Sequence, residues 1–174
     1  YEESREDIAR KLASDRGAVL VPSFEDGHII AGQGTCGLEL MDQLEDLHER
    51  IDQLLVCCGG GGLIAGTSLA IKQRDPTIKV YSVEPKNFDD HARSLISGQL
   101  EVNSPSARSI CDALLAPSPG RMTFDINQKT LAAGLTVSDD EVKEAIKFAY
   151  STLKLVVEPG GAVALAAVLS NKVA

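Results

Sequence analysis

The chain has 174 residues, of which 44% are hydrophobic and 24% charged, and its formal net charge is -8. This length suits one domain and the balance is that of a globular protein, so disorder and collagen-like repeats are excluded. The acidic charge and the absence of tryptophan argue against a nucleic-acid binder. No apolar run approaches the roughly 20 residues that cross a bilayer, and the charged first residues do not resemble a signal peptide. We therefore expect a cytoplasmic protein with no membrane partner.

In the first half of the chain, short apolar runs alternate with helical patterns. A helix capped by Ser4 is expected to end near Arg16, and a short buried strand follows it. The expected elements are the helix 4–16, the strand 18–21, a loop and helix over 29–48, the strand 54–58 and the helix 63–74.

The same alternation continues in the second half, where Pro105, Pro117 and Pro119 mark one long loop. The expected elements are the strand 78–83, the helix 89–96, the loop 98–119, the helix 122–128, the strand 135–137, and the helices 138–155 and 162–169. Strands alternating with helices indicate βαβ units and a mainly parallel sheet. The predicted fold class is therefore α/β, a three-layer αβα arrangement within a single domain over residues 1–174.

Four consecutive glycines, Gly59, Gly60, Gly61 and Gly62, stand between an apolar strand and a helix. Glycine permits positive φ and close approach of the backbone, and successive N–H groups form a concave nest for an anion. The following helix adds the positive end of its dipole. The run therefore predicts a phosphate site, and the alternative is a tight turn without a ligand.

Which phosphate is bound remains open from spacing alone. A P-loop is excluded because no Gly-Lys-Ser/Thr follows the glycines. A Rossmann-type NAD site survives as an alternative, since Gly60, Gly62 and Ala65 match G-x-G-x-x-A and Glu84 follows about 20 residues later.

Several motifs in order along the chain resemble the large domain of fold-type II pyridoxal-phosphate enzymes, in the branch of threonine/serine dehydratases and serine racemase. They cover nearly the whole chain. They are the segments 30–35 (IAGQGT), 59–66 (GGGGLIAG), 82–85 (SVEP), 135–139 (LTVSD) and 157–161 (VEPGG), together with Glu39 and Asp112.

The resemblance implies a lyase that converts a small hydroxy amino acid to a 2-oxo acid and ammonia, with pyridoxal 5'-phosphate as the electron sink. It also implies that Gly59 to Gly62 bind the cofactor phosphate, that Asp112 and Glu158 belong to the cofactor site, and that Arg5 lies near the substrate carboxylate. A fixed guanidinium suits a carboxylate. Alternatives are a serine racemase or hydroxyaspartate dehydratase of the same family, or a non-catalytic phosphate-binding module.

Acidic residues gather after the strand 78–83, at Glu84, Asp89 and Asp90. Oxygen ligands of this kind suit Mg²⁺ or Ca²⁺, although acids at a helix start are also favoured by the dipole alone. The resemblance implies a divalent cation held by Glu84, Asp90 and the backbone carbonyl of Phe88.

Parts of the family's active site have no match in this sequence. None of the nine lysines lies in the Ser-x-Lys-x-Arg-like motif of the Schiff-base lysine, so no catalytic residue is identified. The Ser-Gly-Asn substrate loop and the C-terminal strand also have no match, and Ala113 stands where a glycine is usual. We expect an incomplete large-domain portion that is inactive alone, and from the resemblance a homodimer.

The remaining reactive side chains carry no motif. The cysteines Cys36, Cys57, Cys58 and Cys111 fit no zinc or disulfide spacing and are expected to be reduced. His28, His48 and His91 are expected to be solvated or to lie in loops.

Overall fold

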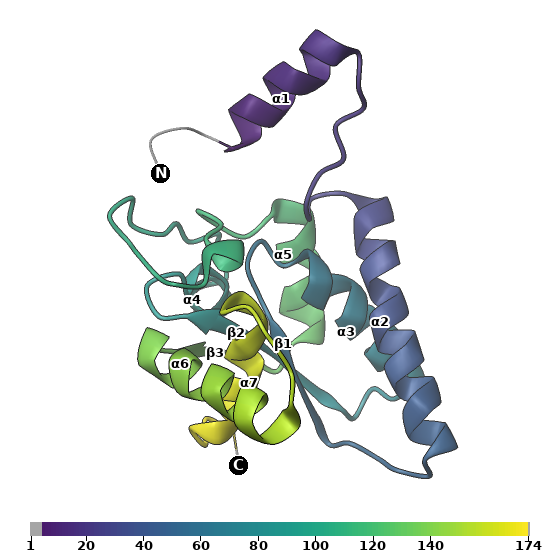
Figure 1. Ribbon diagram of the computed structural model, residues 1–174. Coiled ribbons are helices and arrows are strands. Elements are labelled where there is room, and N and C mark those ends of the chain that lie inside the picture. Colours follow the sequence, from purple (N-terminus) through teal and green to yellow (C-terminus); the bar gives the residue numbers. More distant parts are fainter. Residues whose placement is uncertain (1–4, 174) are drawn as a thin grey trace.

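A computed structural model describes residues 5–173 of the chain (Figure 1). Helices cover most of the chain and enclose a small sheet, and single helical turns interrupt two of the loops. The elements are α1 (Arg5–Arg16), α2 (Gly27–Asp46), β1 (Gln53–Cys57), α3 (Gly62–Arg74), β2 (Lys79–Pro85), α4 (Asp90–Ser97), η1 (Asp112–Leu114), α5 (Arg121–Thr130), β3 (Ala133–Val137), α6 (Asp139–Phe148), η2 (Ala149–Leu153), η3 (Gly160–Ala162) and α7 (Val163–Leu169).

The sheet has the strand order β1-β2-β3, and both of its pairings are parallel. Leu54 pairs with Val80 across the first ladder, and Val83 pairs with Leu135 across the second. The predicted parallel sheet is thereby confirmed, and the carboxyl ends of its strands lie at one edge.

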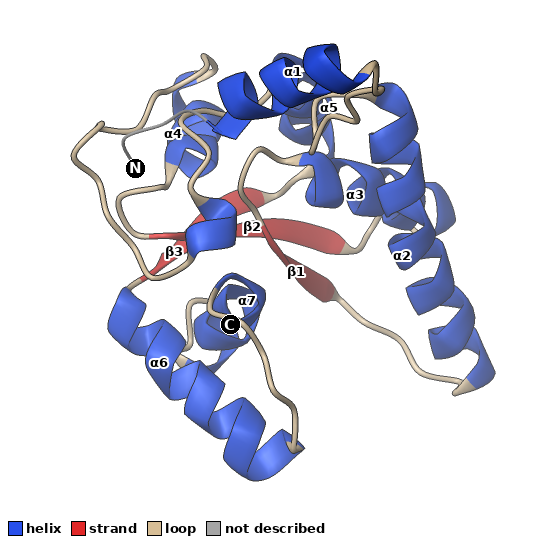
Figure 2. Ribbon diagram, turned by 45° about the horizontal axis from the view of Figure 1, so that its top comes forward, coloured by secondary structure: helices blue, strands red, loops and turns tan. Residues whose placement is uncertain are grey.

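Helices cover the sheet on both faces (Figure 2). Successive strand residues point to opposite faces, so Val80 packs with Ile64 and Ile71 of α3, whereas Val83 packs with Val142 and other residues of α6 and α7. The arrangement is a three-layer αβα fold, as expected from strands that are apolar along their whole length.

Helix α2 begins earlier than the sequence pattern predicted. Asp26 caps it, since its carboxylate accepts hydrogen bonds from the N–H groups of His28 and Ile29. The residues from Gly27 onward, predicted as loop because of their glycines, are therefore helical. Those glycines allow α2 to approach α3: a Cβ on Gly37 would lie 2.8 Å from the Thr67 carbonyl oxygen.

The strand predicted at residues 18–21 does not form. This segment has no regular structure, and the side chains of Val19 and Val21 are 89% and 67% exposed. A short extended segment needs a neighbouring strand to satisfy its backbone groups, and none of the described strands lies beside it. Its last residues, Leu20 and Val21, instead line a cavity described below.

Other boundaries follow the predictions with small shifts. Helix α6 ends at Phe148, and one π-helical turn then carries the chain to Leu153. The loop 98–119 is confirmed apart from the short turn η1, which begins at Asp112. Ser4, the predicted cap of the first helix, lies outside the described residues. Among the described residues, no helix combines the length and apolar character needed to cross a bilayer.

Candidate functional site

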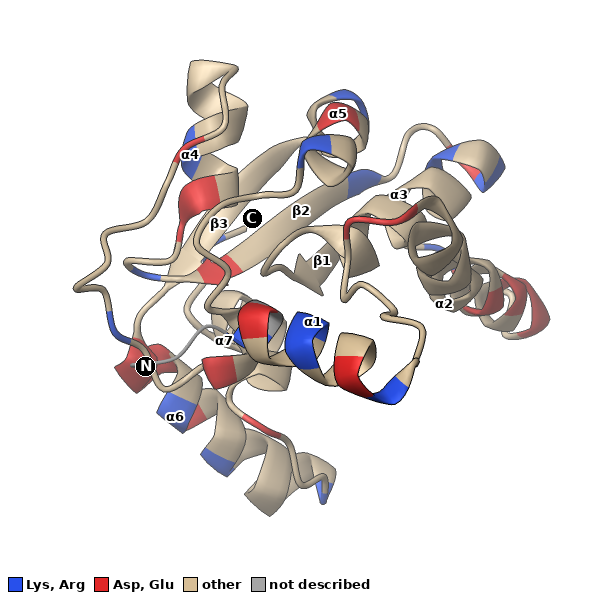
Figure 3. Cartoon of the chain, turned by 90° about the horizontal axis from the view of Figure 1, so that it is seen from above, with Lys and Arg blue, Asp and Glu red and all other residues tan. Residues whose placement is uncertain are grey.

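A cavity of about 850 Å³ lies where strand β1 ends and helix α3 begins. Helix α1 lies over the region between β1 and α7, as the view in Figure 3 shows. Most of the wall is apolar or backbone, with a few charged groups at its margin. The cavity is lined by Arg5, Ala9, Arg10, residues 20–25, Cys57, residues 59–63, Ala113, Leu114, Ala116, Pro117, Glu158, Gly160 and Gly161.

The four glycines form the floor of this cavity and lead into α3. Gly61 occupies the N-cap position with φ 93° and ψ 0°, and no side chain caps the helix. An uncapped helix start presents free N–H groups and a positive dipole end, which suit an anion. The glycine run thus has the geometry of the predicted phosphate nest.

Two of the glycine carbonyl groups are bound on the side of the loop that faces α5. Thr123 Oγ1 lies 2.7 Å from the Gly60 oxygen, and Asn127 Nδ2 lies 3.3 Å from the Gly61 oxygen. The N–H of Gly120 also donates to Gly60, at 3.2 Å. The loop is therefore held by α5 rather than by its own residues.

Side chains would not fit at the centre of the run. A Cβ on Gly61 would lie 2.8 Å from His91 Cε1, and one on Gly60 would lie 2.4 Å from the ring of Phe24. Phe24 is anchored by its neighbour Glu25, whose carboxylate accepts a hydrogen bond from the N–H of Met122 at 2.7 Å. The glycines are required both by conformation and by close packing.

The predicted site residues separate into three groups. Arg5 and Glu158 line the cavity with the glycine loop, and both side chains are exposed. Asp112 is also exposed, but it does not line the cavity, whereas its successors Ala113 and Leu114 do. The acids Glu84 and Asp90 lie outside the cavity lining, and they are described next.

Glu84 is fully buried at the end of β2. Its two carboxylate oxygens accept hydrogen bonds from the N–H groups of His91 and Ala92, at 3.0 and 2.7 Å. Burial, and next the nearby Asp90, raise the pKa of Glu84 well above its usual value. Because Glu84 is enclosed and committed to α4, it is not placed to bind a ribose, which counts against the NAD alternative.

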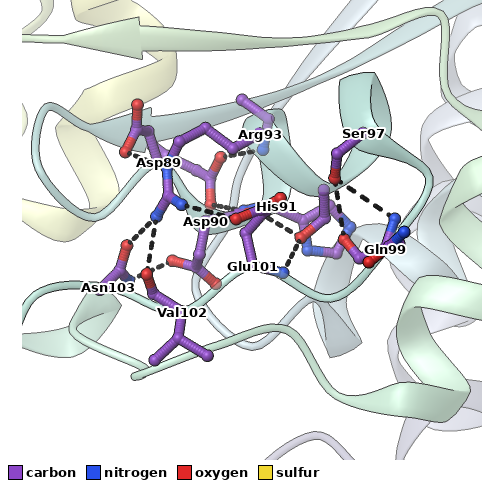
Figure 4. Close-up of polar contacts among 12 residues, drawn as sticks. Asp89, Asp90, His91, Arg93, Ser97, Gln99, Glu101, Val102 and Asn103 are labelled. Carbon is purple, nitrogen blue, oxygen red and sulfur yellow. Dashed lines mark hydrogen bonds and ion pairs between the residues drawn. The ribbon is translucent and has the colours of Figure 1, made fainter.

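Asp90 is the second buried acid, at the start of α4 (Figure 4). Asn103 donates a short hydrogen bond to its Oδ1, while Oδ2 is buried without a hydrogen-bond partner among the described residues. Burial raises the pKa of Asp90 to about 6. The neighbouring Asp89 is instead paired with Arg93, at 3.0 Å.

The residues proposed for a cation thus include one buried carboxylate oxygen without a partner, which is a position that a cation can fill. The described residues contain no group of three or more His, Cys, Asp or Glu side chains arranged for a metal. The set expected here differs in kind, since it combines Glu84 and Asp90 with the backbone carbonyl of Phe88. Glu84 and Asp90 lie close enough for the charge of Asp90 to affect Glu84.

Sequence reasoning missed three buried polar residues beside the glycine loop. The expectation that His91 is solvated is wrong, because it is fully buried; His28 and His48 are exposed as expected. Burial lowers the pKa of His91 to about 4. Thr123 and Asn127 are also fully buried. Their spacing of four residues on a helix places them on one face, but no local motif marks that face as functional.

The cysteines are free thiols among the described residues, as expected. Cys58 and Cys111 are buried, Cys57 lines the cavity, and Cys36 is exposed. Burial raises the pKa of Cys57 and of Cys58, so both are held in the thiol form.

The fold and the glycine nest define an αβα domain built to hold a phosphate group, and comparisons with known proteins identify the family. A family model described as "Pyridoxal-phosphate dependent enzyme" matches residues 1–174. The chain belongs to this family. The family implies pyridoxal phosphate as cofactor, and the uncapped helix start and glycine-lined cavity fit such a group.

Similar sequences include racemases and ammonia-lyases. A serine racemase of Arabidopsis thaliana is 42% identical over 168 residues, which are 97% of this chain and 49% of that protein. An L-threonine ammonia-lyase of Thermotoga maritima is 38% identical over 165 residues, 95% of this chain and 40% of that protein. The chain spans about half the length of the curated relatives that it matches.

Solved structures show the same mixture. A threonine deaminase from the organism abbreviated T.th. superposes with a TM-score of 0.92 and 40% identity, over 97% of this chain and 57% of that chain. A maize serine racemase superposes with a TM-score of 0.88 and 37% identity, over 99% of this chain and 50% of that chain. The predicted family and fold class are confirmed, and both activities occur among the relatives.

Proposed function

We propose that this chain is the phosphate-binding large-domain portion of a dehydratase that converts a small hydroxy amino acid to a 2-oxo acid and ammonia. The observation that carries the proposal is the glycine run, whose backbone forms the floor of the cavity at the uncapped start of α3. Serine racemase activity is a second candidate, supported by the serine racemases among the relatives.

In this proposal the residues of the chain bind and orient. The glycine N–H groups and the α3 dipole hold the phosphate, and Glu158, which lines the same cavity, orients the ring. Arg5, also in the cavity wall, binds the substrate carboxylate. The cofactor, when bound, supplies an electron sink for the charge that develops at the substrate α-carbon. Asp112 has less support, because it lies beside the cavity rather than in its wall.

A Schiff-base lysine is not among the described residues that line the cavity. The nine lysines of the sequence also lie outside the family's lysine motif. We propose that the lysine comes from a segment outside these 174 residues, and that activity belongs to a protein about the length of the relatives.

An assay of the full protein distinguishes the two candidate activities. It is incubated with L-serine, L-threonine and 3-hydroxyaspartate in turn, and both 2-oxo acid release and the appearance of D-serine are measured. Rapid 2-oxo acid release with little D-serine supports the dehydratase. D-serine as the main product supports the racemase, and no turnover of any of the three contradicts both.

We also propose that Glu84, Asp90 and the Phe88 carbonyl hold Mg²⁺ or Ca²⁺. The support is chemical, since the donors are hard oxygens and one buried oxygen of Asp90 lacks a partner among the described residues. The cation would offset the charge of two buried carboxylates and stabilise the start of α4. A homodimer and a cytoplasmic location are proposed from the resemblance alone, and the dimer is tested by light scattering on the full protein.

A further inference from the structure

Three buried side chains from two helices enclose Gly61. Thr123 and Asn127 come from α5 and His91 from α4, and all three are fully buried. A Cβ on Gly61 would lie 2.8 Å from His91 Cε1 and 3.0 Å from both Asn127 Nδ2 and Thr123 Oγ1. We call His91, Thr123 and Asn127 the loop clasp.

The clasp binds carbonyl groups of the loop, and this determines where the loop N–H groups point. In a planar trans peptide, the N–H of one residue points opposite to the carbonyl of the residue before it. Thr123 holds the Gly60 carbonyl and Asn127 holds the Gly61 carbonyl on the α5 side. The N–H groups of Gly61 and Gly62 are therefore directed away from α5.

His91 determines which way the Asn127 amide faces. Asn127 Nδ2 lies 2.9 Å from His91 Nε2 and 3.3 Å from the Gly61 oxygen, so its two hydrogens serve both acceptors. A reversed amide would place its oxygen against the Gly61 carbonyl oxygen, which is repulsive. His91 must then be neutral with its proton on Nδ1, an atom buried without a hydrogen-bond partner among the described residues.

The arrangement keeps polar groups buried at a cost. Both His91 Nδ1 and Asn127 Oδ1 are buried without hydrogen-bond partners among the described residues, and an unsatisfied buried polar group is unfavourable. Apolar residues of similar size would fill the same space without that penalty. Since the hydrogen bonds that remain end on the glycine loop, the geometry indicates a role in shaping the loop rather than in general stability.

We propose that His91, Thr123 and Asn127 are positioning residues that orient the N–H groups of Gly61 and Gly62 toward a bound phosphate. This inference rests on the proposed function, because it assigns the loop clasp to the phosphate group of the same cofactor.

The experiment compares two ligands that differ only in the phosphate. Dissociation constants of pyridoxal phosphate and pyridoxal are measured for the full protein and its variants, and their ratio isolates the phosphate contribution. Thr123→Val and Asn127→Leu remove donors to the loop. Thr123→Ser retains the hydroxyl. His91→Leu removes the acceptor, and His91→Gln returns an amide oxygen near the position of Nε2.

A control variant separates loop shaping from helix packing. Ser68 and Thr130 form a 2.8 Å hydrogen bond between the same helices, α3 and α5, at a distance from the loop. Thr130→Val is expected to lower thermal stability and leave the ligand ratio unchanged.

We expect Thr123→Val, Asn127→Leu and His91→Leu each to lower the preference for pyridoxal phosphate about tenfold, the size of one lost hydrogen bond to a charged ligand. Thr123→Ser and His91→Gln should restore most of it. Equal weakening of both ligands, or no change in the ratio, would overturn the loop clasp. If the unmodified protein itself shows no preference for the phosphorylated ligand, the proposed function fails instead. Should a variant not fold, the ratios of Thr123→Ser and His91→Gln against Thr130→Val still decide the question.

Discussion

Gly66 of α3 lies against the backbone of Ile30 in α2, so close that a Cβ on Gly66 would be 2.1 Å from the Ile30 carbonyl oxygen. The obstacle is backbone on both sides, which cannot rotate away as a side chain can. Since α3 begins at the glycine loop, this crossing of α2 and α3 also fixes the direction of the helix that carries the phosphate nest (Figure 1).

Replacing Gly66 by alanine should therefore separate the two helices. We expect Gly66→Ala to lower the free energy of unfolding by about 1–3 kcal/mol, the usual effect of overpacking, despite the better helix propensity of alanine. Gly32→Ala in α2 is the matched control, because no heavy atom lies within 4 Å of the added Cβ. It should be stabilising by about 0.5–1 kcal/mol. Equal denaturation midpoints for the two variants would contradict the close crossing.

The capping box of α6 should make stability depend on pH. Glu141 accepts from the N–H of Ser138 at 2.6 Å and pairs with Lys172 at 2.8 Å. The hydrogen bond from Lys172, and next that from the Ser138 backbone, lower the pKa of Glu141 to about 2. This carboxylate contributes stability above its unfolded pKa of about 4.5, and the contribution is lost as the pH falls from there toward 2.

Glu141→Gln keeps a polar group at the capping position but removes the charge. We expect a loss of about 1 kcal/mol at pH 7, since the pair is partly exposed to solvent, and a smaller further loss on acidification than in the unmodified protein. Denaturation curves at pH 7, 4.5 and 3 provide the measurement. Glu144→Gln, which removes an exposed pair with Lys147, should change little. A Glu141→Gln variant with the same pH profile as the unmodified protein would refute the assignment.

Asp139 ties the long loop to the start of α6. One of its oxygens accepts from Ser109 Oγ at 2.6 Å and the other from the N–H of Ile110 at 3.2 Å. We expect Asp139→Ala to destabilise the protein by about 1–2 kcal/mol and to speed amide hydrogen exchange over residues 109–114, which border the cavity. Asp140→Ala is the control, because this neighbour also lies in the first turn but pairs only with Lys143 among the described residues. Unchanged exchange in Asp139→Ala would show that the loop is held by other contacts.

The proposed cation makes opposite predictions in its presence and absence. Without a cation, Asp90→Asn should maintain or raise the melting temperature, because it removes one of two buried carboxylates that repel each other. With Ca²⁺ or Mg²⁺ at 100 times the dissociation constant, the unmodified protein should gain about 2.7 kcal/mol, and Asp90→Asn should gain much less. Asp89→Asn serves as the control, since that acid pairs with Arg93. Equal cation responses in the unmodified protein and Asp90→Asn would exclude Asp90 as a ligand.

Local patterns predicted most of the secondary structure correctly. The apolar run 54–58 and the capping signal at Ser138 correspond to β1 and to the start of α6. These features depend on neighbouring residues alone, through propensity, periodicity and capping. The segment 18–21 had a similar apolar pattern and did not form a strand, because a strand also needs a partner that local sequence cannot supply.

The sequence by itself determined the family, the αβα class, and the glycine run as a phosphate nest, because four consecutive glycines have few other uses between a strand and a helix. Tertiary structure decided which groups shape that nest. His91, Thr123 and Asn127 are widely separated from Gly61 along the chain and carry no motif, so their meeting around it depends on how α4 and α5 pack over the sheet. It likewise decided that Glu84 is enclosed beneath α4, because burial arises from the packing of distant elements and no local pattern reports it.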